Sequence, residues 1–146
     1  MTVVKWRAVA LAGLCLAWAG CQRSPNPIVG TWLVKIPDAP FPLHMFTFHS
    51  DGTVLQSNPD AGDPSTSDSN AMGAWAPDGD GIKGKIVEIT ADRSTRQFVS
   101  RGEISFTLKV SGNAFTGTAS ASFYDADGRQ LRGPLAVKLD GQRILP

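Results

Sequence analysis

PIVGTWLVKI, residues 27–36, places a glycine two positions before a tryptophan and then alternates buried-type and exposed-type side chains. Successive side chains of a β-strand point to opposite faces, so Trp32, Val34 and Ile36 share one face of an extended segment. We therefore expect a strand over residues 28–36 with its large apolar side chains on a single buried face.

The same kind of run recurs along the rest of the chain, each time followed by a short turn. Further strands are expected at Leu43–His49, Thr53–Ser57, Met72–Ala76, Ile82–Ala91, Phe98–Val110, Ala114–Tyr124 and Pro134–Ile144. The turns between them include SDG, PDGDG, SGN and DADG, which suit the positive φ angles of tight hairpins. About eight sequential strands predict an all-β fold, an eight-stranded antiparallel up-and-down β-barrel with room for one small ligand.

Alternation within these strands assigns the barrel interior. The small residues Ala119 and Ala121 share a face with Phe115, and they leave a space that is either a ligand cavity or filled by aromatic side chains from other strands. Trp75 either lines the mouth of the barrel or fills its core. The residues that we expect to contact a ligand are His44, Phe46, Phe48, Trp75, Phe106, Ala119 and Ala121.

Residues 1–20 have the features of a signal peptide. Lys5 and Arg7 precede the uncharged run AVALAGLCLAWAG, which is shorter than the roughly 20 apolar residues that span a bilayer. Trp18-Ala19-Gly20-Cys21 resembles the lipobox of bacterial lipoproteins, in which the cysteine is lipidated, although that family usually has Leu where Trp18 stands. Cleavage after Ala17-Trp18-Ala19 would instead secrete the protein, and a retained apolar anchor is a third alternative.

Cysteine usage favours the lipoprotein. Cys15 lies within the segment that would be removed, so Cys21 has no partner for a disulfide in an oxidising compartment. We expect Cys21 to carry lipid, residues 21–27 to form a tether and residues 28–146 to form the barrel domain. The expected location is the cell envelope. Gln22, and not Asp, follows the cysteine, and by resemblance to enterobacterial lipoproteins this implies the periplasmic face of the outer membrane if the host has one.

Charge argues against a nucleic-acid partner. Removal of Lys5 and Arg7 lowers the formal net charge from +1 to −1, and no basic cluster is present. The two histidines have no nearby cysteine, and the turns at 78–81 and 125–128 lack the further ligands of a calcium loop, so we expect hairpin turns and no metal. No cofactor is expected.

Polar residues inside or beside the barrel are the remaining candidates. Glu88, Arg101 and Glu103 are candidates for the interior or the mouth, but the parity of the strand places Arg101 and Glu103 outward unless Gly102 forms a bulge. The segment 59–70 is either a solvated loop or a lid over the mouth.

Gly30-Thr31-Trp32 resembles the G-x-W signature of the lipocalin and wider calycin superfamily. Together with the segments FTF, DGTV, SNPD and GAW, at 46–48, 51–54, 57–60 and 73–75, it is similar to small bacterial lipocalin-like proteins. The resemblance implies an eight-stranded barrel that binds a small apolar molecule. It also implies a basic residue near the end of the last strand, packed across the tryptophan at the closed end, and Arg143 stands in that place opposite Trp32.

Three functions are compatible with these features. The leading hypothesis is an exported, lipid-anchored barrel that binds a small apolar or amphipathic molecule. The alternatives are a calycin-like cyclase or isomerase, with His44, Tyr124 or Arg101 as acid–base candidates, and a fully packed structural lipoprotein. We assign no catalytic residue. A ligand-sized cavity would exclude the packed barrel, and paired titratable groups inside it would favour the enzyme.

Overall fold

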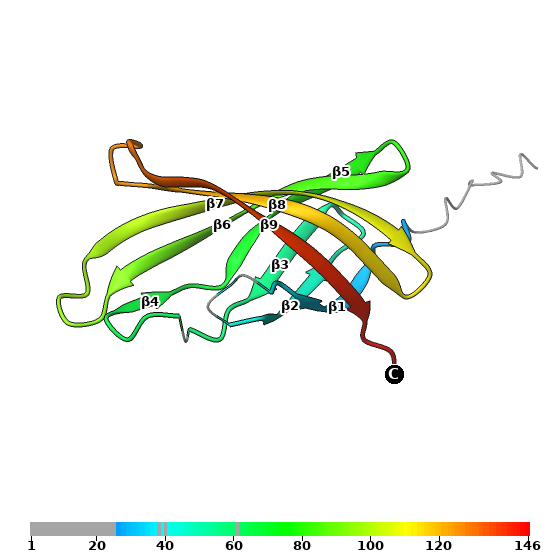
Figure 1. Cartoon of the computed structure of the whole chain (residues 1–146), viewed down its shortest axis with the longest axis horizontal. Helices are drawn as coiled ribbons and strands as arrows, with labels where there is room; N and C mark the ends of the chain where they lie inside the picture. Colours follow the sequence, from blue (N-terminus) through cyan, green and yellow to red (C-terminus); the bar gives the residue numbers. More distant parts are fainter. Residues whose placement is uncertain (1–25, 38, 40, 61) are drawn as a thin grey trace, which may run out of the picture.

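The computed structural model describes residues 26–37, 39, 41–60 and 62–146 (Figure 1). The expected signal peptide and Cys21 lie outside these residues. The strands are β1 (Gly30–Lys35), β2 (Leu43–Phe48), β3 (Thr53–Ser57), β4 (Thr66–Asp68), β5 (Ala71–Asp78), β6 (Gly81–Asp92), β7 (Phe98–Ser111), β8 (Ala114–Tyr124) and β9 (Gln130–Arg143). In the part of the chain that is described, no helix is long and apolar enough to cross a membrane.

Eight of these strands form a closed antiparallel β-barrel, and the prediction of the fold class is confirmed. Neighbouring strands follow the order β1-β2-β3-β5-β6-β7-β8-β9. The barrel closes where β1 pairs with β9, from Trp32 opposite Arg143 to Lys35 opposite Asp140. This architecture is compatible with a lipocalin-like or calycin-like barrel.

The additional strand β4 lies inside the segment 59–70, for which no strand was predicted. It pairs with the far end of β6, Thr66 opposite Asp92 and Asp68 opposite Thr90, whereas β5 pairs with the first half of β6. Its sequence, Thr-Ser-Asp, has no apolar alternation. Hydrogen bonds to polar side chains hold it in place, and the period-2 pattern of hydrophobic residues does not report such bonds.

Strands β6 to β9 are longer than β1 to β3. At one end of the barrel their hairpins, at residues 92–98 and 124–130, extend beyond the short strands (Figure 1). We call this end the mouth. Glycines in the other hairpin turns have positive φ, for example +90° at Gly52 and +59° at Gly112, as the turn sequences predicted.

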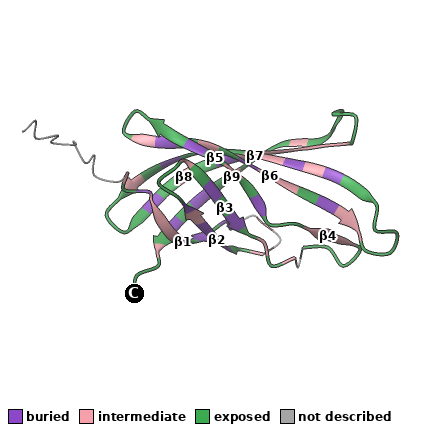
Figure 2. Cartoon of the chain, turned by 180° about the vertical axis from the view of Figure 1, so that it is seen from behind, coloured by how far each residue is buried: buried purple, intermediate pink, exposed green. Residues whose placement is uncertain are grey.

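Burial follows the predicted alternation, and buried and more exposed residues alternate along the strands (Figure 2). The end of the barrel opposite the mouth, which we call the closed end, is filled by aromatic rings. The ring of Trp32 lies 5.0 Å from that of Phe115, and Phe48 lies 6.3 Å from Trp75, centroid to centroid. Aromatic contacts of this kind add to the free energy gained by burial. Side chains of the described residues therefore fill the closed end.

Candidate ligand-binding site

A cavity of about 550 Å³ lies in the half of the barrel that faces the mouth. Its walls come from the residue that follows β1, the start of β2, the end of β3, β4, β6 from Ile86 onward, β7 as far as Phe106, the second half of β8 and β9 as far as Leu139. The lining residues on these strands include Ile36, His44, Phe46, Gln56, Ile86, Glu88, Thr90, Ser100, Ile104, Phe106, Ala119, Ala121, Phe123, Leu135, Val137 and Leu139.

The inner part of the cavity is apolar. Ala119 stands between Phe106 on β7 and Val137 on β9 in the register of the sheet. Phe46 packs against Phe106 with their ring centroids 6.4 Å apart. Because Ala119 and its neighbour Ala121 are small, these rings do not fill the space in front of β8. The small residues of β8 therefore border an open cavity and not a filled core.

His44 supplies a buried polar group to this cavity. The side-chain amide of Gln56 donates to Nδ1 of His44 over 2.8 Å, which leaves the proton of the neutral imidazole on Nε2. His44 is 7% exposed, and its Nε2 has no hydrogen-bond partner among the described residues. Burial lowers the pKa of His44, an effect partly opposed by the backbone of Phe41, so the ring is a neutral donor at physiological pH.

Glu88 supplies a second polar group on the inner face of β6. It stands opposite Gly102 of β7 in the register of the sheet. A Cβ atom at Gly102 would lie 2.9 Å from both Cγ and Oε1 of Glu88 and 3.2 Å from the ring of Phe123. The missing side chain of Gly102 therefore provides the space that the carboxyl group of Glu88 occupies. Burial, and then the negative charge of Asp68, raise the pKa of Glu88 to about 7, against a weaker opposing hydrogen bond from Asn58.

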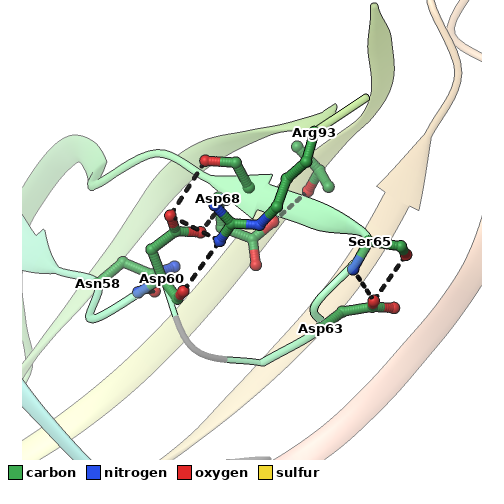
Figure 3. Close-up of polar contacts among 8 residues, drawn as sticks. Asn58, Asp60, Asp63, Ser65, Asp68 and Arg93 are labelled. Atoms are coloured by element: carbon green, nitrogen blue, oxygen red, sulfur yellow. Dashed lines mark hydrogen bonds and ion pairs between the residues drawn. The ribbon is translucent and has the colours of Figure 1, made fainter. Parts of the chain in front are cut away.

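Several residues between positions 59 and 70 line the cavity, namely Gly62, Asp63, Thr66 and Asp68. Polar contacts among neighbouring residues hold this part of the chain in place (Figure 3). Asp60 accepts hydrogen bonds from the backbone N–H of Asp68 over 2.8 Å and from the hydroxyl of Ser67 over 3.1 Å, and it pairs with Arg93 at 2.9 Å. These bonds lower the pKa of Asp60. Asp68 in turn accepts a 2.7 Å hydrogen bond from the Thr90 hydroxyl. The segment is thus attached to β6 and the hairpin that follows it.

The structure brings together five of the seven residues that were expected to contact a ligand. His44, Phe46, Phe106, Ala119 and Ala121 line the cavity. Phe48 and Trp75 are not among its lining residues, and both pack at the closed end, where the indole N–H of Trp75 donates to the backbone carbonyl of His49 over 3.0 Å.

Two of the acid–base candidates lie on the outer surface. The guanidinium of Arg101 contacts Glu103 at 2.9 Å and stacks 5.3 Å from the ring of Tyr124. All three side chains have the outward parity of their strands, since Gly102 and Phe106 point inward. Arg101 and Tyr124 are therefore excluded as groups that act inside the cavity, whereas His44 and Glu88 both line it.

The sequence reading missed several polar residues of the cavity, namely Gln56, Asp68, Thr90 and Ser100. Gln56 and Thr90 could have been found from parity, because Gln56 follows the inward Val54 by two residues and Thr90 follows Glu88 by two. Asp68 carried no such signal, since its strand was not predicted. Hydrogen bonds across β4 and β6 place it at the cavity.

The closed end contains the pair formed by Trp32 and Arg143. The guanidinium carbon of Arg143 lies 4.2 Å from the centroid of the Trp32 ring. Nη1 of Arg143 donates to the carbonyl of Val29 over 2.8 Å, and the indole N–H of Trp32 donates to the carbonyl of Ile28 over 2.8 Å. Gly30 has a φ of +132°, and a Cβ atom there would lie 2.6 Å from Nη1 of Arg143. A glycine stands two residues before the tryptophan because the arginine occupies that space.

The cavity can therefore hold an apolar body against its inner wall and a polar group near His44, Glu88 and Asp68. Across the described ranges, His, Cys, Asp and Glu side chains form no group of three or more that could hold a metal ion. Comparison of the chain with protein-family models, with curated proteins and with solved structures finds no match.

Proposed function

We propose that this protein is an exported, lipocalin-like lipoprotein that binds a small apolar or amphipathic molecule inside its barrel. The observation that carries the proposal is the cavity of about 550 Å³ between the aromatic closed end and the mouth. Ligand sites in proteins are concave, mostly apolar and about 300–1,000 Å³ in volume, with a few polar groups that orient the ligand. The cavity has this composition, with Phe46, Phe106 and Ala119 as apolar wall and His44 and Glu88 as polar groups.

The unfilled space argues against a packed structural barrel. Protein interiors are close-packed, and a void of several hundred Å³ would sacrifice contacts without compensation. Ala119 and Ala121 keep this space open where larger apolar residues would fill it. A binding function accounts for the cost, because a ligand restores the missing contacts.

The placement at the cell envelope rests on the sequence alone. Lipidation of Cys21 would attach the barrel to a membrane through the tether at 21–27. The first strand begins at Gly30, so the barrel would remain close to the membrane surface. An apolar ligand partitions into membranes, and an anchored carrier would meet it there.

Acid–base catalysis is the second candidate, and one observation favours it. His44 and Glu88 line the same cavity, and their pKa values are shifted in opposite directions, with that of Glu88 raised to about 7. A carboxyl group with a pKa of about 7, as at Glu88, can exchange a proton near neutral pH. A carrier would keep one molecule unchanged, whereas a cyclase or isomerase would release a product of the same mass. Chromatography of a bound ligand before and after incubation with the protein separates these outcomes, because an isomeric product would elute at a different position.

Filling the cavity tests the proposed function. Wild-type protein is expected to bind the uncharged fluorescent dye Nile red. Ala119→Trp should abolish binding because the indole would occupy the cavity, while circular dichroism shows that the barrel is still folded. The matched control is Thr118→Trp, which places the same indole on the outer face of β8, where Thr118 is exposed, and should leave binding unchanged. Undiminished dye binding by a folded Ala119→Trp variant would place the site elsewhere.

A further inference from the structure

Two carboxylates stand next to each other on the inner wall near the mouth. Asp68 of β4 pairs with Thr90 of β6, and Glu88 lies two residues before Thr90 on the same face of that strand. Asp68 and Glu88 are therefore diagonal neighbours, and long side chains at such positions reach each other. Both residues line the cavity. Within the described residues, neither takes part in an ion pair with a basic side chain.

The fold makes room for the side chain of Glu88. Gly102 faces it across the sheet, and any larger residue there would collide with its carboxyl group. The hydroxyl of Thr90 holds Asp68 over 2.7 Å. Thr90 of β6 thus holds Asp68, whereas Glu88 occupies the space that Gly102 of β7 leaves open and accepts a hydrogen bond from Asn58.

A second observation points independently to a bound molecule. Nε2 of His44, on the opposite wall, is buried and lacks a hydrogen-bond partner among the residues described. A buried donor without a partner is destabilising, because nothing replaces the hydrogen bond to water that it loses. Because His44 lines the same cavity as Glu88, a ligand in the cavity is in a position to supply the missing acceptor.

We propose that the molecule held in this cavity is an amphipathic amine that also carries an oxygen acceptor. Its ammonium group lies between Glu88 and Asp68, its oxygen accepts from Nε2 of His44, and its apolar body lies against Phe46, Phe106 and Ala119. This inference rests on the proposed function and specifies the class of ligand.

Electrostatics favours an ammonium group over a neutral or anionic one. A half-buried carboxylate without a cation is costly, and the charge of Asp68 adds to that cost at Glu88. A cation bound between them removes the repulsion and forms charge-assisted hydrogen bonds. The other charged residues that line the cavity are Asp63 and Arg132, and the guanidinium of Arg132 lies 5.0 Å from the ring of Phe123. The charges of Asp63 and Arg132 cancel in sum, so Glu88 and Asp68 determine the sign of the net charge of the cavity, which is negative when both are ionised.

Three probes with the same apolar chain test the proposal: decylamine, decan-1-ol and decanoate. Each is added to wild-type protein with bound Nile red at about pH 8, where a glutamate with a pKa near 7 is mostly ionised. Decylamine should displace the dye at a concentration about tenfold or more below that of decan-1-ol, as a charge-assisted hydrogen bond predicts. Decanoate should be the weakest competitor.

Substitutions assign the preference to the two carboxylates. Glu88→Gln should bring decylamine to within about twofold of decan-1-ol, since only the charge is removed. Asp68→Asn should reduce the preference by a smaller factor, and it provides a second test if Glu88→Gln does not fold. Glu103→Gln is the matched control, because Glu103 lies on the outer face of the neighbouring strand β7 and pairs with Lys85 and Arg101. It should keep the wild-type preference.

The outcomes separate this inference from the proposed function. If decan-1-ol and decylamine compete equally in wild-type protein, the cavity binds apolar molecules and the amine inference is wrong. A preference that persists in both Glu88→Gln and Asp68→Asn would also overturn it. If wild-type protein binds neither the dye nor any probe, the proposed function itself fails.

Discussion

The guanidinium of Arg143 lies over the indole ring of Trp32, with its carbon 4.2 Å from the ring centroid. This contact joins the last strand to the first, because Trp32 and Arg143 are partners where β1 pairs with β9. Arg143 also donates hydrogen bonds to the backbone carbonyls of Pro27 and Val29. The side chain of Arg143 therefore connects the β1–β9 pairing, which closes the barrel, with residues 27–29, which lead into β1.

Truncation of either partner should destabilise the protein, and the two effects should not add. Trp32→Ala is expected to lower the free energy of unfolding by roughly 3–5 kcal/mol, since Trp32 is fully buried. Arg143→Ala should cost less, because stacking contributes about 0.5–2 kcal/mol. Residues in contact share an interaction energy that a double-mutant cycle measures by urea unfolding. Arg143→Lys should retain part of it. Strict additivity in the cycle would contradict the pairing.

Gly30→Ala should destabilise the protein by roughly 1–3 kcal/mol, because φ there is +132° and the new Cβ would collide with Arg143. In an Arg143→Ala background the cost should fall, since the collision is gone and only the backbone strain remains. Urea unfolding of the four proteins measures both values. Gly112→Ala is the control, because Gly112 also has a positive φ but nothing lies within 4 Å of its Cβ position. An equal cost of Gly30→Ala in both backgrounds would exclude the collision.

Cys21→Ser should move the protein from the membrane fraction to the soluble fraction, because the thiol that would carry the lipid is lost. The measurement is immunoblotting of fractionated cells of a bacterial host, supported by the mass of the purified N-terminal peptide. Replacing Cys15 by Ser is the control and should leave the location unchanged. Wild-type protein that is soluble and begins at Gly20 would disprove the lipoprotein and support ordinary signal-peptidase cleavage.

The architecture could be predicted because the barrel strands carry a period-2 pattern. Most inward positions from Trp32 to Leu139 are apolar or small, with polar exceptions at the cavity such as His44, Gln56 and Glu88, and turn residues separate the runs. Burial of one face per strand is a local property of the sequence, so the pattern identifies both the strands and their faces. The strand β4 was missed because polar hydrogen bonds through Asp60 hold it, and such bonds connect residues whose spacing follows no period.

The candidate site could be predicted only in part. Parity alone placed His44, Phe46, Phe106, Ala119 and Ala121 on the inner wall. Parity does not say how far along the axis a residue lies, and for that reason Phe48 and Trp75 were assigned to the cavity although they pack at the closed end. The neighbours of Glu88 follow from register and from the placement of β4, both of which depend on tertiary structure.

Glu88 makes the stability of the protein depend on pH. Its pKa is about 7 in the folded protein against an ordinary value of 4.5, so the folded state holds this proton more tightly than the unfolded state. The free energy of unfolding therefore falls as pH rises from about 4.5 to about 7. Below about pH 4.5 Glu88 is protonated in both the folded and the unfolded state, so it does not lower the free energy of unfolding. Above about pH 7 it is ionised in both states, and the full cost of holding the carboxylate in the folded protein is present.

Glu88→Gln should remove this penalty, and the variant should be more stable than the wild type at about pH 8 by up to roughly 3 kcal/mol, with little difference at about pH 4. Urea unfolding at several pH values measures the difference. His44, which lines the same cavity and whose pKa is lowered, is present in both proteins, as is Asp68, so the difference between the two proteins reports Glu88. Glu103→Gln is the control, because the pKa of Glu103 is shifted in the opposite direction: the hydrogen bond from Lys85 lowers it. Loss of the Glu103 carboxylate should therefore not stabilise the protein. A stability difference between Glu88→Gln and wild type that is the same at every pH would show that the carboxyl group of Glu88 is not held in the buried position between Gly102 and Asp68.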